Sequence, residues 1–345
     1  MKKFSMILTL ILVLSLLAGC AGTTVVYQTN CTCPTGSHDV TVPTESAAPE
    51  AVPETIPSDH LVSGAVKTGL SVVTGIKIDE EAGKASYDVT FVAVNVDDNG
   101  VITACAIDSL GADVPLDAIA DTNGEVKTKQ ELCYDYNMIT YGGAKYEWFE
   151  QANALANYAV GKTLEELKNG AVGETGYAQD ADLATSATIY LGGYVSAIEK
   201  AVANAKHLGA SAGDELKLAS VNALKEGGLN CDAVALTMKD GVITSCYLDS
   251  VQAALKVAED GTVSAGNTMT KNELGYDYNM ITYGGAKFEW FEQAEGFAAY
   301  VTGKTPAEIS GIAVDESTYP TDADLTASCT IAIGGFQALI AKAAA

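Results

Sequence analysis

Two short segments rich in hydroxyl side chains are the part of this sequence best suited to chemistry. Residues 182–189 read Asp-Leu-Ala-Thr-Ser-Ala-Thr-Ile, and residues 324–331 read Asp-Leu-Thr-Ala-Ser-Cys-Thr-Ile. Each segment lies shortly before an alanine-rich stretch with helical spacing. Serine and threonine oxygens in such a place often accept hydrogen bonds from the free N–H groups of the next helix. Capping is therefore the simplest interpretation, and a modified threonine is the chemically interesting one.

A nearly identical nineteen-residue stretch also occurs twice. Residues 134–152 read YDYNMITYGGAKYEWFEQA, and residues 276–294 differ from them only by Phe288 in place of Tyr146. Shorter matches at nearly the same spacing surround both stretches, including the two hydroxyl-rich segments. Self-similarity at a fixed period indicates duplicated structural units. The sequence predicts two tandem copies of one domain, at residues 63–207 and 208–345.

Within each copy the pattern predicts an α+β domain. Residues 87–96 and 101–107 alternate apolar and polar side chains around Asn99-Gly100, which indicates a β-hairpin. Residues 147–160 have apolar side chains at helical spacing, and Thr163 is a candidate N-cap for residues 164–168, with Gly170 as a stop. Residues 194–205 and 336–344 predict a last helix in each copy. The expected fold is an antiparallel sheet with flanking helices.

Other catalytic constellations are missing from the sequence. The three histidines, His38, His60 and His207, cannot assemble a Ser-His-Asp triad or a metal site inside a domain. There is no P-loop and no dinucleotide-binding glycine motif. Cys105 and Cys246 occupy matching strand positions and are expected to be buried. The chemistry therefore falls to the duplicated segments.

The hairpin, the Thr-Lys-Gln/Asn-Glu-Leu and Glu-Trp-Phe-Glu-Gln-Ala stretches and the hydroxyl-rich ending resemble the FMN-binding domains of exported flavoproteins. The resemblance covers most of each copy. It implies FMN joined by a phosphoester to the last threonine of an Asp-x-x-Ser/Thr-Gly-Ala-Thr motif, installed by a flavin transferase. In the first copy the matching positions are Asp182, Thr185, Ala187 and Thr188, with Thr188 as the acceptor. In the second copy Asp324 matches, and Thr330 would be the acceptor.

The sequence departs from the motif at its glycine, which is Ser186 in one copy and Ser328 in the other. The second copy also has Ala327 and Cys329 at the two flanking motif positions. Glycine permits a positive φ and a close approach of backbone to phosphate. A serine there either blocks the transferase or only reshapes the turn, and both interpretations remain open.

The identical stretch supplies side chains suited to a flat ring. Aromatic and methionine side chains can hold isoalloxazine between them, while adjacent glycines let the backbone approach. We expect such a pocket to be lined by pairs of equivalent residues: Tyr136 and Tyr278, Met138 and Met280, Tyr141 and Tyr283, Trp148 and Trp290. Lys129, Lys145, Lys271 and Lys287 could offset the cofactor's negative charge. The alternative is that these aromatic residues belong to the core.

The N-terminus indicates export. Two lysines and an apolar run precede Leu17-Ala18-Gly19-Cys20, which resembles the lipobox of bacterial lipoproteins. Residues 1–19 are then a signal peptide, and Cys20 is the lipidated N-terminus of the mature chain. Residues 20–62 are rich in Pro, Thr and Glu and predict a disordered stalk. The expected location is the extracytoplasmic face of the cell membrane, through the lipid anchor only.

Composition excludes one class of partner. The 345 residues carry a net charge of −24, with lysine as the basic residue throughout, which opposes binding to nucleic acid. We expect a tethered flavoprotein that relays electrons from a membrane dehydrogenase or the quinol pool to extracellular acceptors, with hopping between its two domains. Two alternatives stay open: a non-catalytic lipoprotein that binds a small molecule or flavin through a degenerate motif, and a reductase with one specific substrate.

Overall fold

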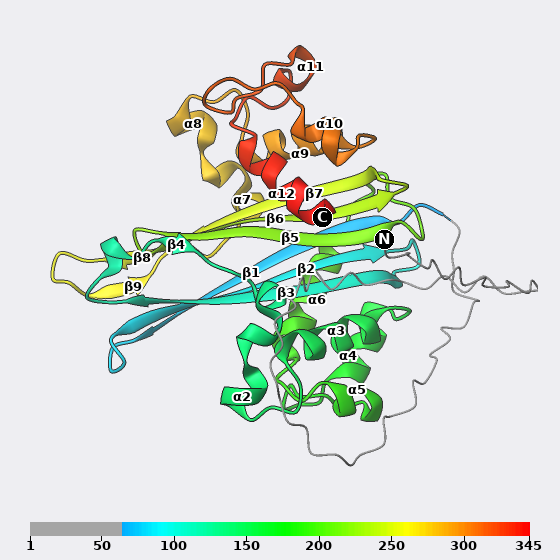
Figure 1. Ribbon diagram of the computed structural model, residues 1–345, viewed down its shortest axis with the longest axis vertical. Coiled ribbons are helices and arrows are strands. Elements are labelled where there is room, and N and C mark those ends of the chain that lie inside the picture. Colours follow the sequence, from blue (N-terminus) through cyan, green and yellow to red (C-terminus); the bar gives the residue numbers. More distant parts are fainter. Residues whose placement is uncertain (1–63) are drawn as a thin grey trace, which may run out of the picture.

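The computed structural model describes residues 64–345. The predicted signal peptide, the lipidation site Cys20 and the stalk lie outside the described residues. The chain that follows alternates antiparallel sheets with groups of short helices (Figure 1). The predicted class, α+β with antiparallel sheets and flanking helices, is confirmed.

The first sheet contains three antiparallel strands in the order β1 (Lys67–Asp79), β2 (Lys84–Val96) and β3 (Ile102–Pro115). The predicted hairpin is β2 and β3. Its turn is held by the Asp97 carboxylate, which accepts hydrogen bonds from the N–H groups of Asn99 and Val101, and Gly100 has a φ of 82°. Strand β1 was not predicted, because its apolar residues around Leu70 and Val72 form only a short pattern, which does not separate strand from helix.

Helices cover one face of this sheet. The elements after β3 are η2 (Ile119–Asp121), β4 (Gly124–Glu125), α1 (Lys129–Leu132), η3 (Cys133–Tyr136), α2 (Met138–Gly142), α3 (Trp148–Ala159), α4 (Leu164–Ala171), α5 (Ala181–Ser186) and α6 (Gly192–Ala203). Helices α3, α4 and α6 are the three that were predicted. Thr163 caps α4 by accepting from the Glu166 N–H, and the helix ends one residue beyond Gly170.

The same order of elements recurs in the C-terminal half. It consists of β5 (Glu215–Lys225), β6 (Gly228–Lys239), β7 (Val242–Ala253), β8 (Leu255–Val257), β9 (Val263–Ala265), α7 (Lys271–Leu274), η4 (Gly275–Tyr278), α8 (Met280–Gly284), α9 (Trp290–Val301), α10 (Pro306–Ser310), α11 (Ala323–Thr326) and α12 (Gly334–Ala344). Helix α12 starts two residues before the predicted boundary.

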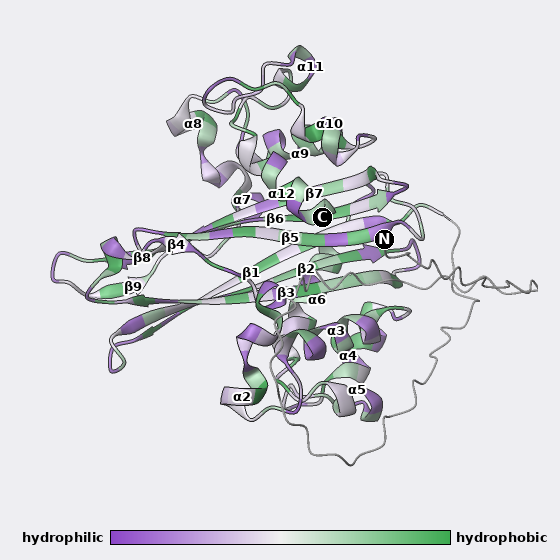
Figure 2. Ribbon diagram, in the orientation of Figure 1, coloured by the Kyte–Doolittle hydropathy of each residue, from purple (hydrophilic) through white to green (hydrophobic). Residues whose placement is uncertain are grey.

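The two sheets pack face to face between two outer helical layers (Figure 1). Tyr87, Phe91 and Leu110 of the first sheet share one buried cluster with Leu229 and Val251 of the second. The Tyr87 hydroxyl also donates to the carbonyl of Gly227, 2.8 Å away. Figure 2 shows apolar residues recurring along the strands of both sheets. The inner face of each sheet is therefore covered by the other half of the chain.

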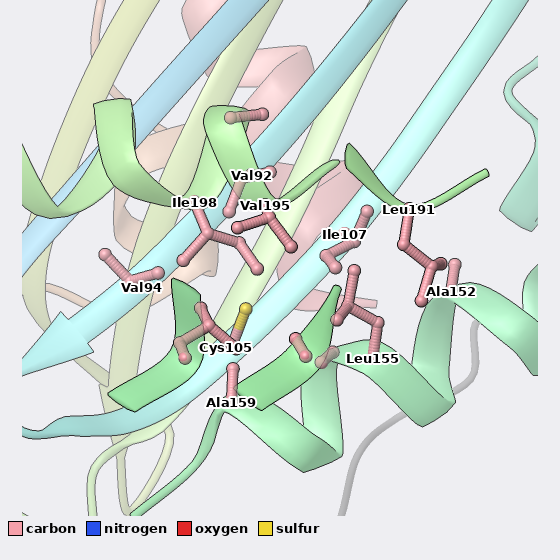
Figure 3. Close-up of a cluster of buried hydrophobic side chains, with 14 of the residues drawn as sticks. Val92, Val94, Cys105, Ile107, Ala152, Leu155, Ala159, Leu191, Val195 and Ile198 are labelled. Atoms are coloured by element: carbon pink, nitrogen blue, oxygen red, sulfur yellow. The ribbon is translucent and has the colours of Figure 1, made fainter. Parts of the chain in front are cut away.

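The outer face of the first sheet holds a second core (Figure 3). Val92, Cys105 and Ile107 contact the apolar faces of α3 and α6, which contribute Leu155 and Ile198. An equivalent cluster under α9 and α12 includes Cys246. The expectation that Cys105 and Cys246 are buried is confirmed, since their exposed fractions are 1% and 2%. Burial on both faces explains why these strands are so apolar.

A short pairing between strands also joins the two halves. Strand β4 of the N-terminal half pairs with β5, through Gly124 opposite Leu224 and Glu125 opposite Ala223. It extends the second sheet to four strands, in the order β4-β5-β6-β7. Within residues 64–345, none of the helices has the length and apolar character needed to cross a membrane.

Candidate functional site

A buried carboxylate sets up the site in the N-terminal half. Glu147, 3% exposed, accepts hydrogen bonds from the backbone N–H groups of Met138 (2.8 Å) and Ile139 (3.1 Å) at the start of α2. The same side chain forms a capping box with Glu150 at the start of α3. One residue therefore satisfies free N–H groups of two helices and fixes their relative position.

Gln151 lies one turn further along α3 and reaches the hydroxyl-rich segment. Its Oε1 accepts from the Thr188 N–H (2.8 Å), from the Thr188 hydroxyl (3.1 Å) and from the Ile189 N–H (3.1 Å). Its Nε2 donates to the Tyr146 carbonyl (2.9 Å) and lies 3.6 Å from the sulfur of Met138. Gln151 is fully buried, so these partners satisfy the amide inside the protein.

The C-terminal half repeats this arrangement. Glu289 accepts from the N–H groups of Met280 and Ile281, at 2.8 and 3.0 Å. Gln293 accepts from the Thr330 N–H (2.8 Å) and hydroxyl (3.0 Å), and donates to the Phe288 carbonyl (2.9 Å). The two threonines named from the motif therefore have the same polar anchor. Sequence reasoning missed Gln151 and Gln293, although both lie in the repeated stretch.

The start of the motif forms a short helix, α5. Asp180, outside the motif, caps it by accepting from the Asp182 and Leu183 N–H groups, both at 3.0 Å. Asp182 itself is exposed, and the structure places Asp324 in the same way behind the cap Asp322. The Thr185 hydroxyl donates to the Asp182 carbonyl at 2.7 Å. These three side chains therefore lie on the outer surface of the segment.

The serines at the motif's glycine position fit without backbone strain. Neither Ser186 nor Ser328 is among the described residues with positive φ. The Ser186 hydroxyl donates to the Leu183 carbonyl at 3.2 Å, and the Ser328 hydroxyl to the Leu325 carbonyl at 3.4 Å. The local conformation thus does not require the freedom of glycine. Ser186 is the last residue of α5, whereas Ser328 lies two residues beyond the end of α11.

Thr188 is exposed, with its hydroxyl directed to Gln151. It does not cap the next helix, since α6 starts at Gly192 with Leu191 at its N-cap and no side-chain capping bond. Thr330 is half-buried, and Cys329 before it is fully buried. The capping interpretation of the hydroxyl-rich segment is therefore wrong for Thr188, an exposed turn residue whose hydroxyl donates to Gln151.

The aromatic residues expected around a ring are divided between core and surface. Met138 and Met280 are half-buried beside the glutamines, whereas Tyr141 and Tyr283 are each 86% exposed. Trp148 is 2% exposed, and its Nε1 donates to the Tyr194 hydroxyl at 2.9 Å. Side chains so different in burial do not line one enclosed pocket. Tyr141 and Tyr283 instead project into solvent from α2 and α8.

The lysines expected near the cofactor also differ in their surroundings. The Lys129 ammonium lies 5.3 Å from the ring centres of both Tyr136 and Trp148, and Lys271 lies 5.3 and 5.0 Å from Tyr278 and Trp290. Such cation–π contacts hold these lysines within the protein. Lys145 is exposed, and its Nζ is 3.4 Å from the Thr185 carbonyl. Lys145 is therefore the lysine that reaches the motif.

Asp108 and Asp249 occupy matching positions near the starts of α1 and α7. Asp249 is 5% exposed and accepts from the N–H groups of Ser250 and Asn272. Burial raises the pKa of Asp249 to about 6 and that of Asp108 to about 7, although hydrogen bonds from nearby backbone N–H groups act in the opposite direction. Both carboxyls therefore titrate near neutral pH.

The two hydroxyl sites lie on opposite sides of the molecule. Helices α2 and α5 lie at the outer edge of one helical layer, and α8 and α11 at the outer edge of the other (Figure 1). The two packed sheets and both helical layers separate them.

The comparisons with known proteins identified no relative: no family model, curated protein or solved structure matches this chain. Among the described residues there is also no group of three or more His, Cys, Asp or Glu side chains placed to hold a metal ion. The functional argument therefore rests on the geometry of the threonine sites.

Proposed function

We propose that this chain is a lipid-anchored, extracytoplasmic flavoprotein made of two tandem FMN-binding-like domains. Thr188 and Thr330 are the acceptors, each joined to the phosphate of one FMN through its Oγ1. The flavin supplies the redox chemistry. The protein relays electrons from a membrane dehydrogenase or the quinol pool to acceptors outside the cell.

One observation carries the proposal: in both halves a buried glutamine holds the motif threonine in the same way. A residue that only filled a turn would not need a fully buried amide with three hydrogen bonds from the segment. Thr188 is exposed, as an acceptor must be to meet a transferase. Transfer from a flavin dinucleotide such as FAD forms the Oγ1–P bond, breaks the pyrophosphate bond with AMP as the leaving group, and releases the hydroxyl proton, which removes one of these hydrogen bonds. The two backbone N–H bonds to Gln151 remain and keep the segment in place.

One lysine brings positive charge to the segment that contains Thr188. The chain is strongly acidic, and Asp182 lies close by in the motif. Lys145, whose Nζ donates to the Thr185 carbonyl, brings a positive charge to this surface. Lys287 is at the matching position of the second half. A single lysine in solvent offsets part of the phosphate's charge.

The Ser-for-Gly departures do not argue against attachment. Both serines sit at negative φ with their hydroxyls bonded back to the preceding helical turn, so they leave the threonine's backbone conformation intact. The remaining difference between the sites is access, because Thr330 is half-buried.

Intact mass of the mature protein, co-produced with a flavin transferase, tests the proposal. We expect two added FMN groups in the wild type, one in Thr188→Ala, one in Thr330→Ala, and none in the double variant. Ser196→Ala is the matched control, since it removes an exposed hydroxyl on α6 that lies outside the motif and leaves the acceptor in place. An unmodified wild type, in cells that flavinylate another exported protein, would contradict the proposal.

A second candidate concerns the C-terminal half alone. The half-buried Thr330 and its buried neighbour Cys329 favour a domain that keeps the fold without carrying flavin. The Thr188→Ala protein separates the two: an FMN adduct supports two loaded sites, and an unmodified mass supports one.

A further inference from the structure

Tyr190 follows Thr188 by two residues, and its ring packs against the backbone of two glycines. A Cβ atom on Gly176 would come within 2.2 Å of the Tyr190 ring, and one on Gly192 within 2.7 Å of its hydroxyl oxygen. Gly176 also has a φ of 77°, which side chains seldom adopt. The ring can occupy this place because both positions lack a side chain.

A second tyrosine completes the surface. The Tyr177 ring meets the Tyr190 ring edge to face, with centres 5.8 Å apart and planes at 88°. Backbone hydrogen bonds hold the two segments together, from the Leu191 N–H to the Gly176 carbonyl at 2.8 Å and from the Gly173 N–H to the Tyr177 carbonyl at 3.0 Å. The rings are 50% and 55% exposed. They therefore present a fixed aromatic surface that begins two residues along the chain from the exposed Thr188.

The C-terminal half has the same backbone and keeps Tyr319, 46% exposed, at the position of Tyr177, but it lacks a counterpart of Tyr190. Hydrogen bonds from Ile333 to Thr318 and from Asp315 to Tyr319 reproduce the turn, each at 2.9 Å. However, Ala332 stands where Tyr190 stands in the first half. Thr318, at a φ of 65°, replaces Gly176, and a Cβ on Gly334 would lie 2.9 Å from its side chain. Threonine thus fills part of the space that the aromatic ring takes in the first half.

We propose that Tyr177 and Tyr190 form an aromatic wall for a flat ring tethered at Thr188, and that the site at Thr330 lacks this wall. This inference rests on the proposed function. The exposed face of a tyrosine is a favourable platform for another π system. Its electron-rich face is a poorer neighbour for a reduced, electron-rich ring than for an oxidised one. The flavin at Thr188 should therefore be less fluorescent and harder to reduce than the flavin at Thr330.

Proteins with one acceptor test this directly. Thr330→Ala and Thr188→Ala each carry a single flavin, whose presence is read from intact mass. In the Thr330→Ala background, Tyr190→Ala should raise the flavin fluorescence by at least about twofold and raise the reduction potential. Tyr134→Ala is the matched control, because Tyr134 has the same 55% exposure but packs its edge on Phe149. It should change neither quantity.

The reciprocal variant introduces the tyrosine and its glycine neighbour into the C-terminal half. In the Thr188→Ala background, Thr318→Gly combined with Ala332→Tyr should lower both fluorescence and potential toward the values of the first site. An unmodified mass in both single-acceptor proteins overturns the proposed function and this inference together. A protein that carries its flavin but keeps its fluorescence and potential after Tyr190→Ala overturns the aromatic wall alone.

Discussion

Lys200 of α6 and Glu273 of α7 form an ion pair of 2.7 Å that joins the two halves of the chain. Lys342 of α12 and Glu131 of α1 form the matching pair at 2.6 Å, in the reverse direction. Each lysine also donates to a strand carbonyl of its own half, Val72 or Ser220. Helix α6 therefore contacts the first helix of the other half, α7, and α12 contacts α1. The two contacts are related by an approximate two-fold symmetry.

Glu273→Gln should destabilise the protein by about 0.5 to 1 kcal/mol in urea unfolding, because both partners are about one-third exposed and the pair is partly screened. Glutamine preserves the capping box with Thr270, so the change isolates the charge. Glu308→Gln is the control, since Glu308 has the same capping role at Thr305. In a double-mutant cycle with Lys200→Met, the losses in unfolding free energy should be non-additive. Additive losses would mean that the ion pair contributes nothing.

Neither half should fold as a stable monomer. Residues 64–207 alone would expose the inner face of the first sheet, including Phe91 and Leu110, which are fully buried in the whole chain. Exposed patches of this kind lead to association or aggregation. Each half should aggregate or dimerise in sedimentation experiments, whereas the two co-produced halves should associate with each other. A monomeric half with a cooperative unfolding transition would contradict the shared core.

Gln151→Met should cost on the order of 2 to 4 kcal/mol, because the similar-sized side chain leaves the N–H groups of Thr188 and Ile189 and the Tyr146 carbonyl without their partner. The Thr188 segment should then lose its fixed position. We expect the mass to show loss of FMN at Thr188 with retention at Thr330, and the reverse for Gln293→Met. Equal loading of both threonines in either variant would show that the glutamine anchors are irrelevant to attachment.

Asp249 should make stability fall as pH rises from about 4 to 6. Burial raises its folded pKa to about 6, above the unfolded value of roughly 4. In this interval the folded state therefore binds more protons than the unfolded state, which gives a negative slope of stability against pH. Asp249→Asn, which has no charge to bury, should gain on the order of 2 kcal/mol relative to wild type between pH 4.5 and 7.5.

The neighbours of Asp249 are Thr270 and Glu273, and the Glu273 charge raises its pKa further. The control is Asp260→Asn, because backbone N–H bonds lower the pKa of that exposed carboxyl, and its effect is confined to more acidic pH. Urea titrations at both pH values measure the difference. Parallel pH profiles for wild type and Asp249→Asn would contradict the prediction.

Electron exchange between the two flavins of one molecule should be slow. Hopping between tandem domains was predicted from the sequence, but the proposed acceptors follow α5 and α11, which lie in the two opposite outer helical layers (Figure 1). Redistribution of electrons in half-reduced protein should therefore proceed mainly by collision between molecules, and its rate in stopped-flow experiments should increase with protein concentration. A rate independent of concentration would indicate transfer within one molecule.

The regular elements were the predictable part of the fold. Alternation along β2 and helical spacing along α3 reflect faces that are buried and exposed in turn, which a single sequence reveals. The sandwich of two sheets was not predictable, because a strand apolar on both sides does not say what covers each side. Gln151 was missed because glutamine in a helix is ordinarily a surface residue. Tyr141 was expected in a pocket from its type alone, and type does not fix direction.

The packing of one half on the other also governs how the polypeptide must mature. A chain that emerges N-terminus first completes β1, β2 and β3 well before β5 to β7 exist. During that delay Tyr87 and Phe91 face water, and β4 has no β5 with which to pair. Nascent intermediates with such surfaces are prone to aggregate. The N-terminal half of the nascent chain therefore needs protection from aggregation until the second sheet has formed and α12 has docked.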